Sequence, residues 1–164
     1  MSNYDDLKDL WNSHPCPKGK GWVVQVPTSE LPYFNHADMG DNGEIAYEAI
    51  REGVGGYIER VPLPQPLEKH MDIWANEEGL LMADPELNFW ITRIVQDAWN
   101  FYQAGSEVPM DVLPKSNRKL TTELPMIFGD CFITGRDGKE LTKRAMKFIA
   151  SRIYSEEGQK YAGS

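Results

Sequence analysis

Two stretches of this chain, VGGYIERVPL at residues 54–63 and NEEGLLM at residues 76–82, decide the fold. The first contains the pair Gly55 and Gly56, and glycine readily adopts the left-handed conformation that ends a helix. The residues at 57–61 are rich in aromatic and β-branched side chains and are followed by proline, which is typical of a strand. This stretch therefore predicts a helix that ends and leads directly into a strand.

The second stretch predicts a hairpin. Residues 71–75 have the composition of a strand, and the turn that follows ends in Gly79, where a positive φ angle costs least. We expect residues 80–82 to return as a second short strand. Neither stretch contains a catalytic motif, so they indicate an architecture and leave the activity open.

The rest of the chain completes the predicted fold. Residues 28–43 read as a polar loop, residues 105–123 as a second loop, and 126–134 as a central strand because both of its faces are apolar. We predict one α+β domain with a small, mostly antiparallel sheet packed against about three helices. The other predicted elements are a short helix at 5–11, a strand at 22–26, a helix from 44, and helices at 86–104 and 139–154.

The predicted domain covers residues 22–154 and has a lengthened helix and loop near 89–123. Residues 1–21 form an N-terminal extension, and residues 155–164 form a frayed tail. We leave open whether the lengthened region docks on the core or projects from it.

Composition is that of an ordinary globular protein, with 164 residues, 41% hydrophobic and 26% charged. No apolar run approaches the roughly 18 residues that a membrane span needs, and the acidic start lacks a secretory signal. The only cysteines are Cys16 and Cys131, and Cys131 lies in an apolar run, so we expect it to be buried without a disulfide. We expect a cytoplasmic protein with no membrane partner and no cofactor.

The net charge of −8 is unevenly distributed. Residues 1–100 hold 17 acidic and 7 basic side chains, whereas residues 101–164 hold 8 acidic and 10 basic ones. Such an acidic first part repels phosphate backbones, so nucleic acid is not an expected partner.

The histidines and carboxylates form no recognisable metal or catalytic motif. His14, His36 and His70 lack the close spacing of zinc ligands, and Glu77 and Glu78 point apart in a turn. Two groupings keep a hydrolase open as an alternative: His70 and Asp72 with Glu59, and Asp130 with Arg136. Each needs a concave pocket that gathers its members.

A weak anion site is predicted where residues 135–138 lead into the last helix. Free N–H groups at a helix N-terminus attract anions, and basic side chains reinforce that attraction. The candidate anion-binding residues are Arg136, Lys139 and Lys143. The alternative is that Asp137 simply caps the helix.

Aromatic side chains on the helix at 86–104 are the clearest candidates for an interaction surface. Trp90 and Trp99 are nine residues apart, which places them about 180° apart around a helix. One of them is therefore expected to be an exposed anchor or an oligomer contact, unless the N-terminal segment with Trp11 covers it. The candidate interaction residues are Trp90, Trp99, Phe101 and Tyr102.

The order of these pieces resembles the small domain-of-unknown-function family 3846, which occurs on phages, plasmids and conjugative elements of bacteria. The resemblance rests on the VVQVP strand, VGGYIERVPL, DIWANEEGLLM, FGDCFITG and the terminal helix that starts with Leu-Thr, and covers about residues 23–153. Residues 83–88 replace a Leu-Pro-Asn-type segment of the family, residues 89–123 are longer, and the first twenty residues are additional. The family supplies no catalytic residues to carry over.

The resemblance implies a non-enzymatic binding protein that acts in the bacterial host cytoplasm. Its partner would be a host protein or a small signalling molecule, with counter-defence as a hypothesis, and it could form a homo-oligomer. One alternative is an acidic mimic of DNA that inhibits a nucleic-acid enzyme. The net charge of −10 over residues 1–100 motivates it. The other alternative is a small nucleotide-processing hydrolase.

Overall fold

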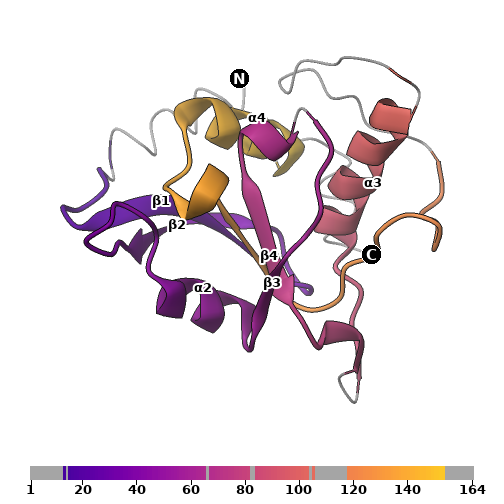
Figure 1. The fold of residues 1–164 in the computed structure, drawn as a ribbon, viewed down its shortest axis with the longest axis horizontal. Helices are drawn as coiled ribbons and strands as arrows, with labels where there is room; N and C mark the ends of the chain where they lie inside the picture. The colour runs from indigo at the N-terminus through magenta and orange to yellow at the C-terminus, as the bar shows by residue number, and fades with distance from the viewer. Residues whose placement is uncertain are drawn as a thin grey trace.

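A five-stranded antiparallel sheet forms the centre of the protein in a computed structural model, which describes residues 13, 15–65, 67–81, 84–103, 105 and 118–153 (Figure 1). The strand order is β2-β1-β5-β4-β3, and every neighbouring pair runs antiparallel. The α+β prediction is confirmed, with β5 in the centre as expected. The strands are β1 (Lys20–Val26), β2 (Tyr33–Asp38), β3 (Ile58–Arg60), β4 (Asp72–Asn76) and β5 (Cys131–Thr134).

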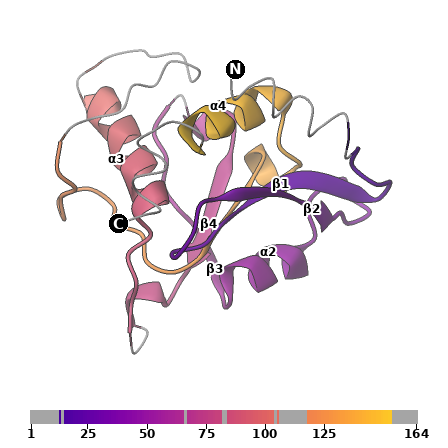
Figure 2. The same ribbon diagram turned by 180° about the vertical axis from the view of Figure 1, so that it is seen from behind.

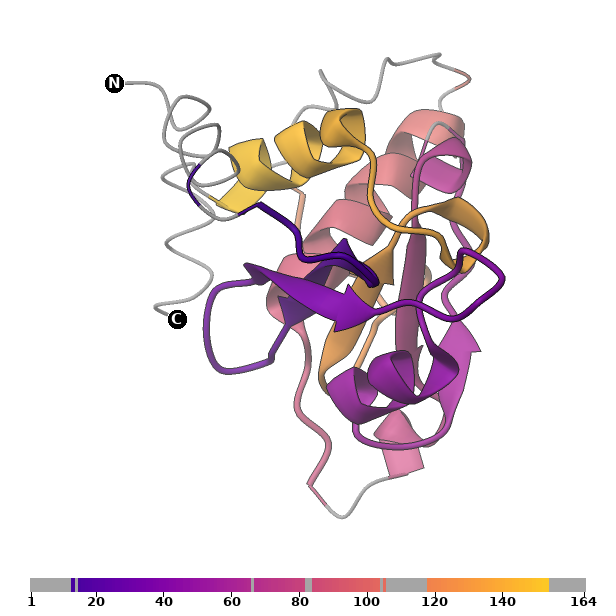
Figure 3. The same cartoon turned by 90° about the vertical axis from the view of Figure 1, so that its left-hand side faces the viewer.

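Three helices cover the two faces of this sheet. Helix α2 (Tyr47–Val54) packs on one face, and α3 (Phe89–Gln103) and α4 (Lys143–Ile153) pack on the other. Figure 2 shows the same arrangement from behind, and Figure 3 shows the sheet edge-on between the helices. The result is a single small domain with a layer of helix on each side of the sheet.

Strand alternation divides the core into two parts. Val24, Ile133 and Ile73 lie in register across β1, β5 and β4 and face α3 and α4. Their neighbours Phe132 and Trp74 point to the opposite face, toward α2. Successive side chains of a strand point to opposite faces, so the apolar strand at 126–134 is buried on both sides, as its composition predicts.

Helix α2 ends where the sequence indicates, but its glycines have different roles. Gly55 is the C-cap, with φ 84°, and its N–H donates to the Arg51 carbonyl. Gly53 lies inside the helix. A Cβ at Gly53 would lie 2.3 Å from the Phe132 ring, so glycine is required for α2 to approach the sheet.

Two sequence predictions about strands are wrong. Residues 33–38, read as part of a polar loop, form β2 at the edge of the sheet, where half-exposed polar side chains are accommodated. Residues 79–81 form a 3-10 turn instead of returning as a hairpin strand. Gly79 is buried against the Phe128 backbone, and this contact turns the chain away from β4.

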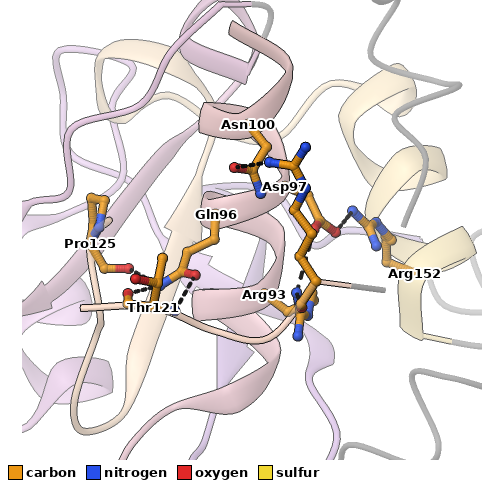
Figure 4. A network of polar contacts seen from close by, with 8 residues as sticks. Arg93, Gln96, Asp97, Asn100, Thr121, Pro125 and Arg152 are labelled. Carbon is orange, nitrogen blue, oxygen red and sulfur yellow. Dashed lines mark hydrogen bonds and ion pairs between the residues drawn. The ribbon is translucent and has the colours of Figure 1, made fainter. Parts of the chain in front are cut away.

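The described part of the lengthened region docks on the core. The apolar face of α3, including Trp90, Ile91 and Val95, is buried against the sheet. A polar stripe on α3 then holds the returning chain, because Gln96 bonds to Thr121 and Pro125 (Figure 4).

Several sequence predictions lie outside the described residues: the helix at 5–11, the role of His14, the cover by Trp11 and the tail at 155–164. Within the part of the chain that the structure describes, no helix is long and apolar enough to cross a membrane.

Candidate functional site

A hollow of about 330 Å³ opens beside the N-terminal end of β4, and we call it the Arg60–Arg136 hollow. Its volume lies at the lower end of the range for small-molecule sites, about 300–1,000 Å³. The polar part of its lining comes from the end of β3, the start of β4 and two short turns, and consists of Arg60, Glu68, Asp72, Arg136 and Asp137.

Asp72 is the buried anchor of this hollow. Asp72 is only 4% exposed. Its carboxylate accepts a hydrogen bond of 3.2 Å from the Gly138 N–H and another from the Asp137 N–H. The Arg60 guanidinium lies 3.9 Å from the other side of the same carboxylate. One buried carboxylate therefore fixes both the turn that carries Arg136 and the strand that carries Arg60.

The turn at Arg136–Gly138 has an unusual backbone. Asp137 has φ 62°, and it is the only non-glycine residue with a positive φ angle in the described chain. Aspartate tolerates this left-handed conformation better than most residues do, though at some energetic cost. The two N–H bonds to Asp72 offset that cost, so the strained turn and the buried carboxylate form one unit.

The two arginines differ in their surroundings. Arg60 is held between the Asp72 carboxylate and the ring of Trp74, 5.6 Å from its centroid. Arg136 is exposed, and its guanidinium makes no hydrogen bond or ion pair with any residue that the structure describes. Arg136 is therefore available to bind a carboxylate or phosphate group with its planar fork of donors.

The remaining lining of the hollow is apolar. It is built by the proline-rich segment after β3 and by the residue before β4, namely Val61, Pro62, Leu63 and Met71.

Burial raises the pKa of the Asp72 carboxyl above its ordinary value, although Arg60 and the two backbone N–H donors oppose this shift. At the end of the preceding 3-10 turn, burial and the charges of Arg144 and Lys69 lower the pKa of His70. His70 does not line the hollow, so its imidazole is not placed to exchange a proton with Asp72 there.

The structure brings together only part of each predicted grouping. From the set of His70, Asp72 and Glu59, only Asp72 lines the hollow. Glu59 neighbours Arg60 along β3 and points to the opposite face. Asp130 and Arg136 flank opposite ends of β5, so neither grouping forms a shared pocket.

The predicted anion site differs in geometry from the structure. Helix α4 begins at Lys143, where Thr142 caps it by accepting a bond from the Ala145 N–H. The prediction that Asp137 caps this helix is wrong, because residues 136–138 form a separate turn. Arg136 lines the hollow, whereas Lys139 and Lys143 are exposed outside its lining.

The aromatic candidates on α3 occupy different environments. Trp90 is buried, with 6% of its surface exposed. Trp99 is half-buried, and its ring packs edge-on against the ring of Tyr102 with 5.6 Å between the ring centroids. Phe101 is half-buried, while Tyr102 remains 55% exposed. Both tryptophans contact the core between the sheet and helices α3 and α4. Trp90 is part of that core, and Trp99 packs against it.

Sequence reasoning missed Arg60, the partner of Asp72. Its signal is an arginine at the end of a strand, followed by the prolines at 62, 64 and 66. Among the described residues, no group of three or more His, Cys, Asp or Glu side chains could hold a metal ion. Cys16 and Cys131 are both free thiols, and Cys131 is fully buried.

Comparison with known proteins gives one match. No curated protein and no solved structure matches the chain. The model of the domain of unknown function DUF3846 matches residues 23–154, which is most of the chain and includes every strand and helix named above apart from the start of β1. The chain therefore belongs to the DUF3846 family.

Proposed function

We propose that this protein is a non-enzymatic binding protein of a phage or other mobile element, and that it binds a small molecule in the Arg60–Arg136 hollow. It acts in the cytoplasm of a bacterial host. Its role is counter-defence by sequestering a small signalling molecule. The family's association with mobile elements motivates this context, and the hollow motivates the kind of ligand.

One observation carries the proposal: among the described residues the Arg136 guanidinium has no partner, and it lies at a hollow where the buried Asp72 holds the neighbouring turn. A binding site whose groups are already held in place loses less entropy when its ligand binds. Here the Asp72 carboxylate joins two segments more than sixty residues apart in sequence. The backbone turn that carries Arg136 is therefore held in place, and it presents an anion-binding side chain at a hollow that also has apolar lining residues.

The charges at the hollow narrow the class of ligand. Arg60 and the backbone donors offset the charge of Asp72, whereas Glu68 and Asp137 add negative charge. A polyanion would be repelled by these carboxylates. The lining suits a small molecule that carries one anionic group for Arg136, hydrogen-bond donors for the carboxylates, and an apolar part for Leu63 and Met71.

Binding can be tested by thermal unfolding with a panel of inorganic phosphate, amino acids, mononucleotides and cyclic dinucleotides. A ligand that binds only the folded state raises the unfolding midpoint. We expect at least one compound of the panel that carries an anionic group to raise the unfolding midpoint of the wild-type protein. The same compound should not raise the midpoint of Arg136→Ala. Lys139→Ala is the matched control, because Lys139 is an exposed cation near Arg136 that does not line the hollow.

The proposal fails if no compound in the panel shifts the midpoint. It also fails if Arg136→Ala responds as the wild-type protein does. The hydrolase alternative requires instead that an added nucleotide is consumed, with loss of turnover in Asp72→Asn.

A further inference from the structure

Two adjacent leucines project from the end of β4 that lies opposite the Arg60–Arg136 hollow. Leu80 is 66% exposed and Leu81 is 82% exposed, more than any other large hydrophobic residue described. They occupy the 3-10 turn Gly79–Leu81, which projects at the bottom of the view in Figure 3. Together with the turn that precedes it, this forms what we call the leucine tip, residues 76–81.

The leucine tip is held rigidly against the body of the protein. The Glu77 N–H donates to the Tyr57 carbonyl at 2.9 Å, and the Glu78 N–H donates to the Asn76 side chain at 2.8 Å. A Cβ at Gly79 would lie 2.7 Å from the Phe128 carbonyl oxygen, so this residue is in close contact with the backbone of the neighbouring segment.

This rigidity matters for binding. The exposed leucines do not belong to a loosely attached loop, because the backbone on their N-terminal side is fixed by three separate contacts. A surface that is already ordered loses little entropy when a partner covers it.

Several exposed carboxylates lie within the leucine tip and close after it in the sequence. Glu77 and Glu78 lie within it, and Asp84 and Glu86 follow it; all four are exposed. Residues 70–92 contain five acidic side chains and no lysine or arginine. The tip is therefore an apolar point set in a region of negative charge.

We infer that the leucine tip docks into an apolar cleft rimmed by basic side chains on a partner protein. Contiguous exposed apolar side chains mark interaction sites, and complementary charge around them selects the partner and its orientation. Lipid surfaces and nucleic acids carry the same negative charge as this region, which disfavours both. The exposed face of α4 on a second copy offers the cations Lys143, Arg144 and Lys147, but the apolar side chains of α4 are buried and do not face the leucines.

The inference can be tested by quantitative capture from bacterial host extract with the tagged full-length chain. Four proteins are compared in parallel: wild type, Leu80→Ser with Leu81→Ser, Glu77→Lys with Glu78→Lys, and the control Tyr102→Ser. Tyr102 is also an exposed apolar side chain, but it lies on α3, away from the tip. Thermal unfolding of all four confirms that each is folded.

We expect one protein to be captured by the wild type and by Tyr102→Ser, and its yield to fall at least tenfold with each double substitution. With that partner purified, the affinity should fall as salt increases, because the charged rim is screened. The charge-reversed variant keeps both leucines, so it tests the inference even if the leucine substitutions alter the turn.

The inference is overturned if no captured protein loses yield with both double substitutions. It is also overturned if the Tyr102→Ser control loses the same protein to the same extent. Capture of the chain itself in place of a second protein would also overturn it and would identify a self-association surface. Arg136→Ala should leave capture unchanged, so failure at the hollow and failure at the tip can be told apart.

Discussion

The Asp97 carboxylate on α3 accepts a hydrogen bond of 2.8 Å from the Arg152 guanidinium on α4 (Figure 4). The exposed fractions of the two side chains are 0% and 5%, and Arg93 approaches the same carboxylate at 3.8 Å. This buried ion pair joins the two helices that cover one face of the sheet. It is a buried polar link between α3 and the last helix.

Removing one partner of this pair should destabilise the fold strongly. Asp97→Ala leaves the buried Arg152 guanidinium without its carboxylate, and such a change costs about 3–5 kcal/mol. Denaturant unfolding measures the loss. Replacement of both residues together, Asp97→Leu with Arg152→Met, should cost less than Asp97→Ala alone, because the Arg152 guanidinium is then not left buried without its carboxylate. A double variant that is less stable than Asp97→Ala would contradict this account.

Gln96 should hold the chain that returns after the lengthened region. Its Nε2 donates to the carbonyls of Thr121 and Pro125, and its Oε1 accepts from the Thr121 N–H at 3.1 Å. Gln96→Leu is expected to cost about 1–3 kcal/mol, since it leaves buried polar groups unsatisfied. Hydrogen exchange should become faster in residues 118–127.

The matched control is Gln103→Leu, at the exposed end of the same helix. It should change neither the stability nor the exchange of that segment. Equal effects of the two substitutions would show that the hydrogen bonds of Gln96 do not hold the segment.

Gly53→Ala should destabilise the protein even though alanine favours helices. The added Cβ would lie 2.3 Å from the buried Phe132 ring and 2.8 Å from the Gln25 side-chain oxygen. Overpacking costs about 1–3 kcal/mol, against a gain in helix propensity of about 1 kcal/mol. Thermal unfolding measures the net loss, with the exposed Glu52→Ala as control. A more stable Gly53→Ala protein would show that α2 can move away from the sheet at no cost.

Asp72 should make the stability of the protein depend on pH. Because burial raises its pKa in the folded state above the ordinary 3.8, the folded protein holds this proton more tightly than the unfolded chain does. Its contribution to the free energy of unfolding is greatest below pH 3.8 and falls as the pH rises through the folded-state pKa.

Asp72→Asn removes this titration while keeping a side-chain oxygen for the Gly138 N–H. The stability of the wild type relative to Asp72→Asn should therefore fall with rising pH across that window and then level off. Urea unfolding of both proteins at a series of pH values measures the difference. A relative stability that rises with pH would contradict the assigned direction.

Local residue patterns predicted most of the fold. The β-branched and aromatic runs marked β1, β3, β4 and β5, and Gly55 marked the end of α2. The edge strand β2 escaped detection because its sequence, YFNHAD, mixes polar and aromatic residues at half-exposed positions. The return of residues 80–82 was predicted from the turn alone, whereas Gly79 contacts Phe128, which is distant in sequence.

The hollow depended on contacts that sequence spacing does not encode. The sequence points to Arg136 only through its place before a basic helix, and to Asp72 only through the nearby His70. The structure instead joins Asp72 to the turn at 136–138 and to Arg60. A polar period of four residues along α3 does mark contacts: Asn88, just before the helix, and Thr92, Gln96 and Asn100 on it all make hydrogen bonds to other segments of the chain.

The most direct test of small-molecule binding is to identify what the protein carries out of a bacterial host. Wild type, Arg136→Ala and Lys139→Ala would be purified under native conditions and denatured, and the released small molecules quantified by mass spectrometry. The account predicts one molecule near a 1:1 ratio from the wild type and from Lys139→Ala, and its loss from Arg136→Ala. Equal release from wild type and Arg136→Ala, or release from neither, would contradict it.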